Sequence, residues 1–425
     1  MPLIVAFIIL LVLLLLSVYV AATLGVLAII LDKLFTPFPL YQAIGELTWG
    51  ASTDFVLLAI PLFVLLGEIL LKAGIADKVY DALDSWLSWL PGGMLHANIG
   101  TSAMFSATSG SSVATAATVS TVALPQARKF GYNEAFFAGS IAAGGTLGIL
   151  IPPSINLIVY GVLTNTSIPR LFMAGIVPGV MLMIIFMIFI LIACMIWPQL
   201  GSNTKKYTWG YRFSSLRHFL PVIFIFGVVI GTIYAGLATP TESAALGVLA
   251  AILLAACYGK LRLSFFKAVI EATMRTTAMI MLILIAAKFL NFILASIGLT
   301  EMLTTFLNEL GMTPLGTLIV IICVYIVLGF FIETLSLMVI TIPIVTPIVV
   351  AMGYDPVWFG ILLILLIEMA LITPPVGLNL YVVQGVRQRG SITEVMAGSV
   401  PFVIMMFLMM IVLIAFPGMT DILYR

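Results

Sequence analysis

Long apolar runs separated by short charged segments dominate this sequence. A run of about 20 apolar residues is the length at which an α-helix crosses the hydrocarbon core of a bilayer, and charged residues mark where such helices end. The pattern predicts about nine crossings, at residues 3–31, 52–71, 135–165, 173–197, 219–237, 241–257, 276–297, 357–386 and 398–416. For the first run two interpretations are open, one long helix or two shorter helices that divide near Gly25.

Two further apolar stretches, 94–125 and 314–351, are each too long for one crossing and are interrupted midway. We interpret both as re-entrant hairpins. With both as hairpins, only Lys33, Arg170 and Arg425 fall on one side of the membrane, and the basic residues of all other loops fall on the opposite, cytoplasmic side. If either stretch crossed once, the basic residues would scatter over both faces. The first hairpin is then expected to open toward the cytoplasm and the second toward the outside.

Composition agrees with a polytopic membrane protein. Hydrophobic residues make up 63% of the chain, charged residues 8%, and the mean hydropathy is +1.26, whereas soluble domains carry roughly 25% charged residues. The net charge of +1 gives no indication of a nucleic-acid partner. Cys194, Cys257 and Cys323 lie in apolar runs without metal-ligand spacing, so we expect them to pack as small core residues. Two amphipathic segments, Ile75–Leu90 with its two tryptophans and Leu299–Leu310, are expected to lie along the membrane interface.

The second half of the chain repeats features of the first. GILIPPSINLIVYGV at 148–162 resembles ALITPPVGLNLYVVQGV at 370–386. One offset of 222 residues relates Pro152 and Pro153 to Pro374 and Pro375, Pro125 to Pro347, Gly131 to Gly353, and Tyr132 to Tyr354. Because the first copy starts with a segment running inward and the second with one running outward, the copies are predicted to be antiparallel in the membrane. Inverted repeats of this kind are typical of secondary transporters.

Each copy is predicted to interrupt a membrane helix at its Pro-Pro pair. Proline lacks the backbone N–H and clashes with the preceding turn, so nearby carbonyl groups lose their helical partners. Hydroxyl groups and glycines beside the pairs, and at the hairpin tips Thr108–Ser112 and Phe331–Ser336, would supply oxygen ligands for a hard monovalent cation. Helix ends at the same tips could bind an anion. The pattern therefore predicts an ion and solute site near the middle of the bilayer.

Other interpretations of these polar residues stand beside this one. Small and hydroxyl residues also serve close helix packing in membranes, and for Thr115–Thr121 packing is favoured. A carboxylate at membrane depth is costly unless it is paired or solvated, so Glu333 is interpreted as functional or as a neutral acid. Lys288, Glu68 and Glu368 are also intramembrane, and structural roles are expected for them.

Three segments carry a resemblance to a known family: GILIPPSINLIVYG, ATPTESAALGVL at 238–249 and GFFIETLSLMVITIPIVTPIV at 329–349. Over nearly its whole length the chain resembles the large, DctM-like membrane subunit of tripartite ATP-independent periplasmic (TRAP) transporters. The resemblance implies an all-α polytopic membrane protein, an inverted repeat with two re-entrant hairpins and two broken transmembrane helices that move as an elevator. The N-terminal segment departs from the family pattern, because SVYVAATLG lacks the expected small-residue and proline break.

The resemblance also implies function, partners and location. It implies sodium-driven import of a small organic acid, with Na⁺ as the coupling ion, no cofactor and no enzymatic activity. The implied partners are a small four-helix membrane subunit and a periplasmic substrate-binding protein, in a bacterial inner membrane. No glycine-rich phosphate loop is present that would indicate ATP as the energy source.

Carried over by position, the resemblance implies two sodium sites, with solute held between the hairpin tips. The implied sodium-binding residues are Ser106, Ser109, Gly110, Ser111, Ser112, Gly145, Thr146, Ile149, Phe331, Glu333, Thr334, Ser336, Thr373, Pro374 and Gly377. The implied substrate-binding residues are Thr108, Ser111, Ser112, Pro152, Pro153, Asn156, Thr334, Pro375 and Asn379. For Asn156 and Asn379 the residues alone leave two roles open, capping the freed carbonyl groups or touching the ligand.

The expected organisation has four parts. They are an N-terminal helix and loop at 1–51, a first repeat at 52–200, connecting helices at 201–275 and a second repeat at 276–425. An enzyme is disfavoured because His96 and His218 are peripheral and the acids are scattered. A channel is a weaker alternative, since channels usually gain symmetry from identical subunits. A related symporter that works without a binding protein is the nearer alternative.

Overall fold

The computed structural model describes residues 2–16, 18–201, 207–299, 301, 302, 305 and 311–424, and every regular element within them is a helix. The α-helices are α1 (Pro2–Leu15), α2 (Val20–Phe35), α3 (Ile44–Ser52), α4 (Ala59–Ala73), α5 (Ile75–Leu87), α6 (Met94–Ser109), α7 (Ser112–Phe130), α8 (Glu134–Leu150), α9 (Ile155–Thr164), α10 (Ile168–Ile196), α11 (Trp209–Ser215), α12 (Leu220–Tyr234), α13 (Pro240–Cys257), α14 (Leu263–Ser296), α16 (Pro314–Gly329), α17 (Thr334–Ala351), α18 (Pro356–Ala370), α19 (Leu378–Arg387) and α20 (Ile392–Ala415). Short 3₁₀ helices are η1 (Leu40–Ala43), η2 (Pro198–Leu200), η3 (Leu216–His218) and η4 (Pro417–Thr420).

Helix length and apolarity identify the chain as a polytopic membrane protein. Within the described part, six helices are long and apolar enough to cross a bilayer, or up to eight if each of two bent pairs counts as one span. The two bent pairs are α4 with α5, at 67°, and α8 with α9, at 41°. The nine crossings expected from sequence stay a prediction, because α1, α2, α18 and α19 are each shorter than a full span.

The N-terminal boundaries differ from those expected. The first apolar run forms two helices, but the break lies between Leu15 and Val20, whereas Gly25 is inside α2. The run expected at 52–71 becomes helical only at Ala59, after the separate helix α3. An apolar run without capping residues does not mark where a helix stops, and a single glycine is tolerated in a helix interior. The expected division near Gly25 was therefore wrong.

Both stretches expected to be hairpins are pairs of helices. α6 ends and α7 begins around Gly110, whose φ of +61° is a left-handed conformation that favours glycine. Ser111 then caps α7, accepting a hydrogen bond from the Ala114 N–H at 3.4 Å. In the second pair, residues 330–333 separate α16 from α17, and Glu333 caps α17. At each tip a capping residue thus starts the second helix of the pair.

The two Pro-Pro pairs interrupt helices as predicted. α8 ends at Leu150 and α9 begins at Ile155, while α18 ends at Ala370 and α19 begins at Leu378. The Pro152–Pro153 and Pro374–Pro375 bonds are both cis. Across the second interruption the Asn379 N–H donates to the Leu371 carbonyl at 3.1 Å, so part of the exposed backbone finds a partner within the break.

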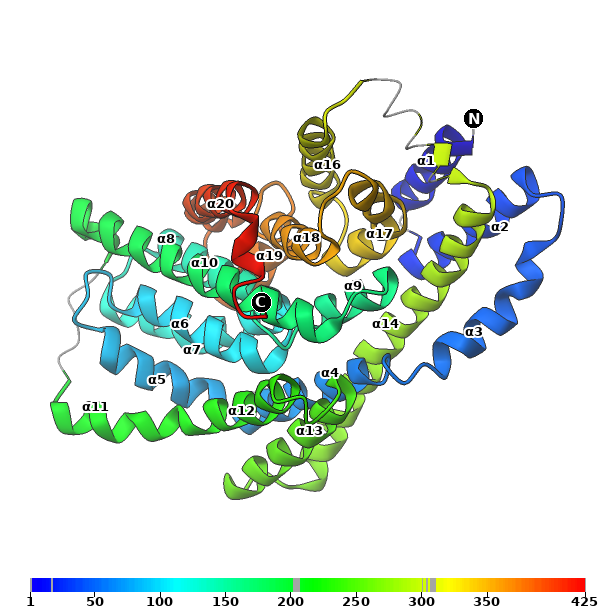
Figure 1. The fold of residues 1–425 in the computed structure, drawn as a ribbon. Helices are drawn as coiled ribbons and strands as arrows, with labels where there is room; N and C mark the ends of the chain where they lie inside the picture. Colours follow the sequence, from blue (N-terminus) through cyan, green and yellow to red (C-terminus); the bar gives the residue numbers. More distant parts are fainter. Residues whose placement is uncertain are drawn as a thin grey trace.

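Helices from both halves of the chain pack into one buried bundle, the transport bundle (α6–α9 and α17–α20) (Figure 1). α8 lies inside it, in contact with α6, α7, α19 and α20, and every residue from Phe136 to Leu150 is buried. α18 is equally enclosed from Val357 to Ala370. Helices so apolar and so buried on all sides are typical of a bundle centre.

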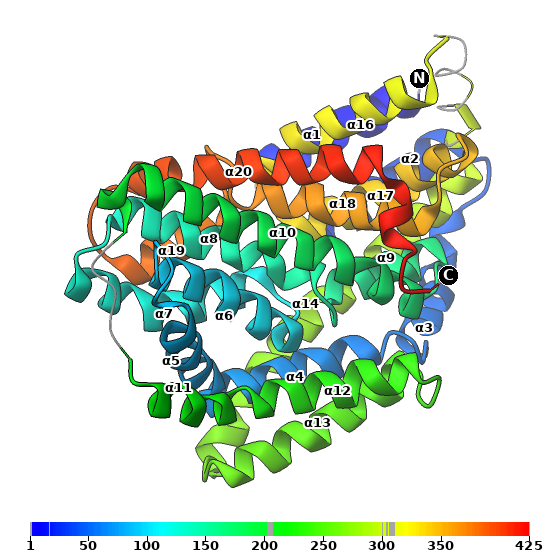
Figure 2. The same cartoon turned by 60° about the vertical axis from the view of Figure 1, so that its left-hand side comes forward.

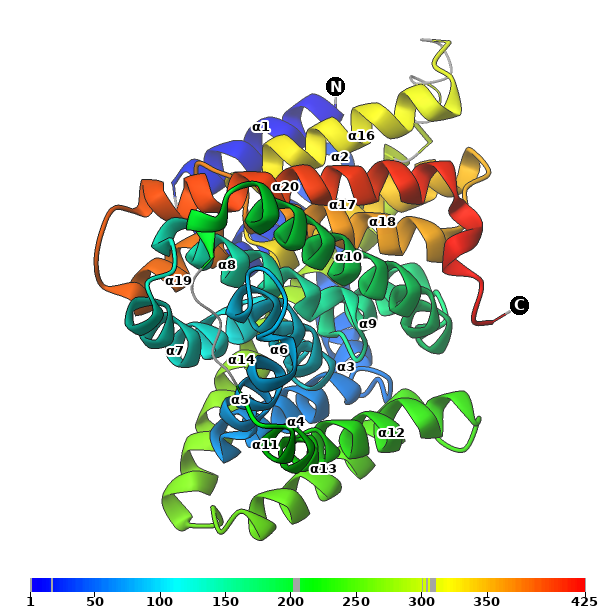
Figure 3. The same ribbon diagram turned by 90° about the vertical axis from the view of Figure 1, so that its left-hand side faces the viewer.

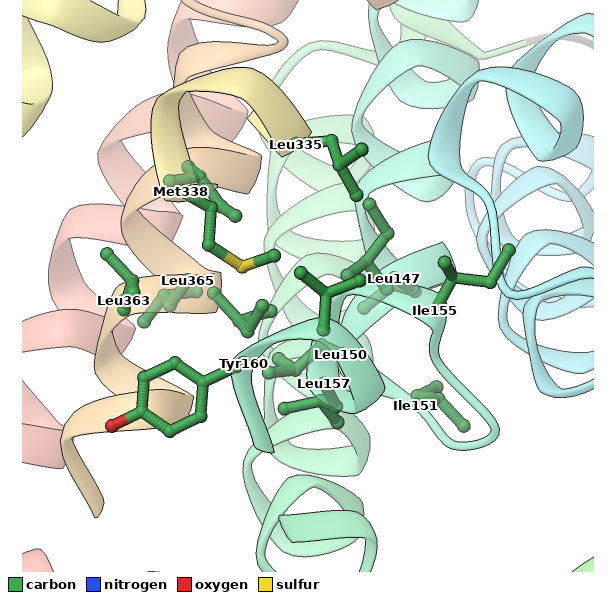
Figure 4. Close-up of a cluster of buried hydrophobic side chains, with 14 of the residues drawn as sticks. Leu147, Leu150, Ile151, Ile155, Leu157, Tyr160, Leu335, Met338, Leu363 and Leu365 are labelled. Atoms are coloured by element: carbon green, nitrogen blue, oxygen red, sulfur yellow. The ribbon is translucent and has the colours of Figure 1, made fainter. Parts of the chain in front are cut away.

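Close backbone contact holds this bundle together. A Cβ added at Gly139 of α8 would lie 2.1 Å from the Gly398 carbonyl oxygen of α20, so only glycine permits this crossing. At the first break, Leu147 and Leu150 share one hydrophobic cluster with Leu335 and Met338 of α17 (Figure 4). The second hairpin therefore packs directly on the broken helix of the first half.

A second group of helices, the framework (α2–α4 and α12–α14), lies beside the transport bundle. The long α14 contacts α2, α3 and α4, and α13 contacts α4 and α12 (Figures 2 and 3). The two groups meet where α4 contacts α6 and α9, where α12 contacts α6 and where α14 contacts α17. These contacts place the first hairpin and the start of α17 next to the framework.

Side-chain exposure tests the expectation that the three cysteines pack as core residues. Cys194 is buried as predicted, but Cys257 and Cys323 are exposed on the isolated chain, so the expectation was wrong for these two. An apolar run does not distinguish a core-facing position from a lipid-facing one. The segment from Ile75 forms α5, while Leu299–Leu310 lies almost entirely outside the described residues. Trp86 donates its indole N–H to the Arg212 carbonyl at 3.0 Å.

Candidate functional site

A cavity of about 280 Å³ lies where both hairpin tips meet the framework. Seven of the residues predicted for the site line it: Gly110, Ser111, Ser112, Ile149, Asn156, Glu333 and Thr334. The framework contributes Glu68 of α4 and Thr276 of α14. Segments more than 200 residues apart in sequence thus converge on one space.

The first hairpin tip is pressed against the first break and the glycine face of α8. A Cβ at Gly110 would lie 2.9 Å from the Pro153 carbonyl oxygen, and a Cβ at Gly148 would lie 2.9 Å from the Ser112 backbone N. A Cβ at Gly145 would be 3.1 Å from the Ser112 carbonyl oxygen. Glycine at these positions lets the start of α7 approach α8 at backbone distance.

The first tip is also tied to the second half of the chain. The Ser112 hydroxyl donates to Oε2 of Glu368, on α18, at 2.6 Å. Glu368 is 1% exposed and Ser112 is 1% exposed, so this contact is fully enclosed. The sequence had marked Glu368 as an acid at membrane depth and favoured a structural role. Only the fold reveals that it reaches the hairpin tip in the first half of the chain.

Several buried oxygen atoms around this tip have no hydrogen-bond partner within the described part of the chain. They are Ser106 Oγ, Glu368 Oε1 and Asn379 Oδ1. Asn379 uses only its amide N–H, which donates to the Ala142 carbonyl at 3.3 Å. Buried polar atoms without partners are rare and destabilising, so each needs an explanation. Hydroxyl, amide and carboxylate oxygens are the donor set that hard cations prefer, and these residues therefore fit such an ion.

The second hairpin tip is organised around its own carboxylate. Glu333 accepts hydrogen bonds from the Leu335 and Ser336 N–H groups and from the Ser336 and Thr334 hydroxyls, each at 3.0 Å. This is the hydrogen-bond pattern of an ionised N-cap, where a negative charge faces the positive end of α17. Of the two interpretations left open, a neutral acid fits this pattern less well.

The remaining predicted residues whose side chains are described lie outside the cavity lining. Thr146 donates to the Ala143 carbonyl at 2.7 Å and approaches Met406, and Thr373 donates to the Met369 carbonyl at 2.6 Å. Phe331 is 74% exposed. Pro152, Pro153, Pro374, Pro375 and Gly377 form the breaks themselves, and Ser336 is held by Glu333. The side chains of Thr108 and Ser109 lie outside the described residues.

Asn156 is the predicted residue with the clearest orientation toward the cavity. It sits in the first turn of α9, 4% exposed, and its amide nitrogen has no partner within the described residues. Opposite it on the framework, Glu68 pairs with Lys72 at 3.8 Å. The Asn156 amide and Glu68 thus line the same, otherwise mostly apolar cavity, an arrangement suited to a small polar solute.

The architecture places the chain among polytopic helical membrane proteins, and a solved structure shares its fold. The Alcanivorax borkumensis YdaH transporter superposes with a TM-score of 0.60 at 15% identity, covering 95% of this chain and 98% of that one. At this identity the likeness concerns the fold alone.

Family membership is shown by sequence. Residues 7–419 match the DctM component of the tripartite ATP-independent periplasmic transporters, and the chain belongs to that family. It is 34% identical over 373 residues to the sialic acid TRAP transporter large permease protein SiaM of Vibrio cholerae, covering 87% of this chain and 86% of SiaM. It is 32% identical to the C4-dicarboxylate TRAP transporter large permease protein DctM of Pseudomonas aeruginosa, with the same coverage. The resemblance drawn from the sequence is thereby confirmed.

Proposed function

We propose that this chain is the membrane subunit of a sodium-coupled importer that carries a small organic acid across a bacterial inner membrane. The observation that carries the proposal is the shared cavity, in which both hairpin tips, one break and the framework meet. A solute held there touches both halves of the chain at once. Its binding can therefore be coupled to ions held behind each tip.

An inverted repeat is the proposed basis of the site. The helix boundaries support it. α7 begins at Ser112, and α17 begins 222 residues later at Thr334. The N-caps of α8 and α18, Asn133 and Asp355, have the same spacing. Equivalent tips and breaks would then approach the cavity from opposite membrane faces. The four-part organisation expected from the sequence stays part of this proposal.

An elevator movement is the proposed mechanism, with the transport bundle sliding along the framework. Its support is a charged cluster that ties four bundle helices together. Arg387, 5% exposed, donates to Glu134 at 2.9 and 3.0 Å and also to Glu394, and Arg128 donates to the Arg387 carbonyl at 2.8 Å. These residues come from α7, α8, α19 and α20. Helices linked in this way can move as one body.

Two sodium sites are proposed, one behind each tip. The first uses Ser106–Ser112 with Gly145–Pro152, and the second uses Phe331–Ser336 with Thr373–Gly377. The unpartnered oxygens of Ser106 and Asn379 support the first. At the second, Glu333 is occupied as a cap, so backbone carbonyls of the break are the more suitable ligands.

A carboxylate solute suits the cavity. The N-terminal ends of α7 and α17 both lie at the cavity, and helix N-termini favour anions. The relatives SiaM and DctM are named for sialic acid and C4-dicarboxylate, which are both carboxylic acids. By family, a small membrane subunit and a periplasmic binding protein that delivers the solute are the proposed partners.

Uptake into proteoliposomes tests the proposal. The chain is reconstituted with its small subunit, a periplasmic binding protein is added with radiolabelled candidate acids, and an inward sodium gradient is imposed. We expect uptake that needs both sodium and the binding protein. Ser111→Leu and Asn156→Leu should lower uptake at least roughly tenfold by filling the cavity.

Thr121→Val is the matched control, because Thr121 is an exposed residue of α7 whose hydroxyl bonds within its own helix. Uptake that persists without sodium would contradict ion coupling. Uptake that persists without the binding protein would instead favour the simpler symporter. Normal uptake by both leucine variants would remove the cavity from the transport path.

A further inference from the structure

We propose that Glu368 is the counter-charge of the first ion site: its Oε2 orients Ser112, and its Oε1 neutralises the coupling cation. This inference rests on the proposed sodium coupling. It adds a carboxylate from the second half of the chain to a site otherwise formed by neutral oxygens of the first half.

Glu368 is enclosed by apolar helix on every side. It lies two residues before the end of α18, where all residues from Val357 to Ala370 are buried, and it is itself 1% exposed. Taking a carboxylate out of water is expensive unless a positive charge or several hydrogen bonds compensate. Glu368 has one hydrogen bond, to Oε2 from Ser112. Oε1 has none within the described residues.

No cationic side chain in the described part of the chain pairs with Glu368. The ion pairs found there involve Asp54, Glu68, Glu134, Glu271 and Glu394 instead. The charged group whose field reaches Glu368 is Glu333, which has the same sign. The charge of Glu333 is already balanced by the start of α17, through two backbone N–H groups. An ionised Glu368 has no balancing positive charge among the described residues, and a bound cation would supply one.

The contact with Ser112 gives this charge a direction. Because the Ser112 hydroxyl donates its hydrogen bond to Oε2, the lone pairs of Ser112 Oγ remain available for another ligand. Asn379 Oδ1 and Ser106 Oγ lie in the same buried region around α8 and are also unpartnered within the described residues. Carboxylates that ligate metal ions are themselves oriented by hydrogen bonds, as Glu368 is by Ser112.

The position in the first half that corresponds to Glu368 shows why only the first ion site gains a carboxylate from the other half of the chain. Thr146 stands 222 residues before Glu368, and its hydroxyl is bonded to its own helix at Ala143. The second ion site therefore has no carboxylate at the corresponding place. The two sites should differ in affinity, because the number of charged ligands strongly sets cation affinity.

Thermal unfolding of the purified full chain in detergent tests the inference without relying on transport. The Tm is measured with increasing NaCl, with choline chloride keeping the ionic strength constant. For the wild type we expect a saturable rise in Tm. For Glu368→Gln we expect a Tm at least equal to that of the wild type without sodium, because the uncompensated charge is gone. With sodium, the apparent affinity of this variant should fall at least roughly tenfold.

Two further variants and a control complete the design. Glu368→Asp keeps the charge and should retain part of the sodium response. Ser112→Ala keeps the carboxylate but removes the hydroxyl, and should weaken the response less than Glu368→Gln does. Glu271→Gln removes an exposed carboxylate that pairs with Lys267 and should behave as the wild type.

Each outcome decides between the possibilities. If Glu368→Gln keeps the wild-type sodium response, Glu368 is a neutral structural acid and the inference fails, while sodium coupling stands. The same conclusion follows if that variant is destabilised equally with and without sodium. If the wild type itself shows neither a sodium-dependent Tm nor sodium-driven uptake, the proposed function fails and takes this inference with it. If Glu368→Gln does not fold, a full wild-type response in both Glu368→Asp and Ser112→Ala would overturn the inference.

Discussion

The two hairpin tips solve the same structural problem with different chemistry. In the first, Gly110 ends α6 and Ser111 caps α7, accepting a long hydrogen bond from the Ala114 N–H. In the second, Glu333 starts α17 and accepts four bonds. The first tip is neutral by itself and receives its carboxylate from Glu368 on the opposite half. The comparison teaches that two helix pairs of similar layout can differ in charge, since the acid that caps the second tip and the acid that contacts the first tip both come from the second half of the chain.

The largest effect is expected where the first tip meets α8. Gly148→Val places a side chain where a Cβ alone would be 2.9 Å from the Ser112 backbone. The contacted atoms belong to the backbone and cannot rotate away as a side chain would, so the whole tip must move. We expect loss of sodium-dependent uptake and about 3 kcal/mol of destabilisation. Uptake and thermal unfolding measure the two effects. Gly227→Ala, on α12 with open space around it, is the control; full uptake by Gly148→Val would show that tip position is not critical.

The next effect concerns the link between the halves. Arg387→Met removes the guanidinium that joins Glu134 to Glu394. Both acids are more than a third exposed, so solvent compensates part of the loss, and we expect about 2 kcal/mol of destabilisation. Thermal unfolding with and without high salt measures it. Unchanged stability would mean that the bundle is held by packing alone.

A loss of stability of similar size is expected at the second tip. Glu333→Ala leaves two N–H groups and two hydroxyls at the start of α17 without their acceptor. The loss should cost about 2 kcal/mol, near the upper end for an N-cap. Uptake should fall as well, because Thr334 loses its orientation. Thermal unfolding and uptake of this variant, compared with Glu333→Asp, test whether capping is the cause; equal losses in both variants would argue against it.

The smallest effect is expected at the equivalent cap of the first tip. Ser111→Ala removes the 3.4 Å hydrogen bond that caps α7, and for the loss of this cap we expect about 0.5 kcal/mol of destabilisation. The ratio of the destabilisation caused by Glu333→Ala to that caused by Ser111→Ala measures how much the two caps differ in strength. If Ser111→Ala is as costly as Glu333→Ala, the two tips are equivalent in strength despite their different chemistry.

Sequence reasoning succeeded where a residue type dictates backbone geometry. Pro152–Pro153 and Pro374–Pro375 cannot continue a helix, and both helices end beside them. Gly110 at the first tip acts similarly, since it ends α6. The division of each expected hairpin into two helices could also be predicted, because each stretch was too long for one crossing.

Sequence reasoning failed where apolar residues alone would have to indicate a helix boundary or an exposed face. It also failed where residues in contact are far apart in the sequence. The N-terminal break and the exposure of Cys257 and Cys323 depend on neighbours that an apolar run does not specify. Glu368 was visible as an unusual acid, but its contact with Ser112 joins positions 256 residues apart. Only tertiary packing brings such groups together.

The central claim is that both tips enclose one sodium-dependent cavity, and direct binding of radioactive sodium to the purified chain tests it most closely. We expect saturable binding to the wild type and to Thr121→Val, and loss of at least the first-tip component in Gly148→Val. Absence of saturable binding to the wild type, or unchanged binding to Gly148→Val, would contradict the claim.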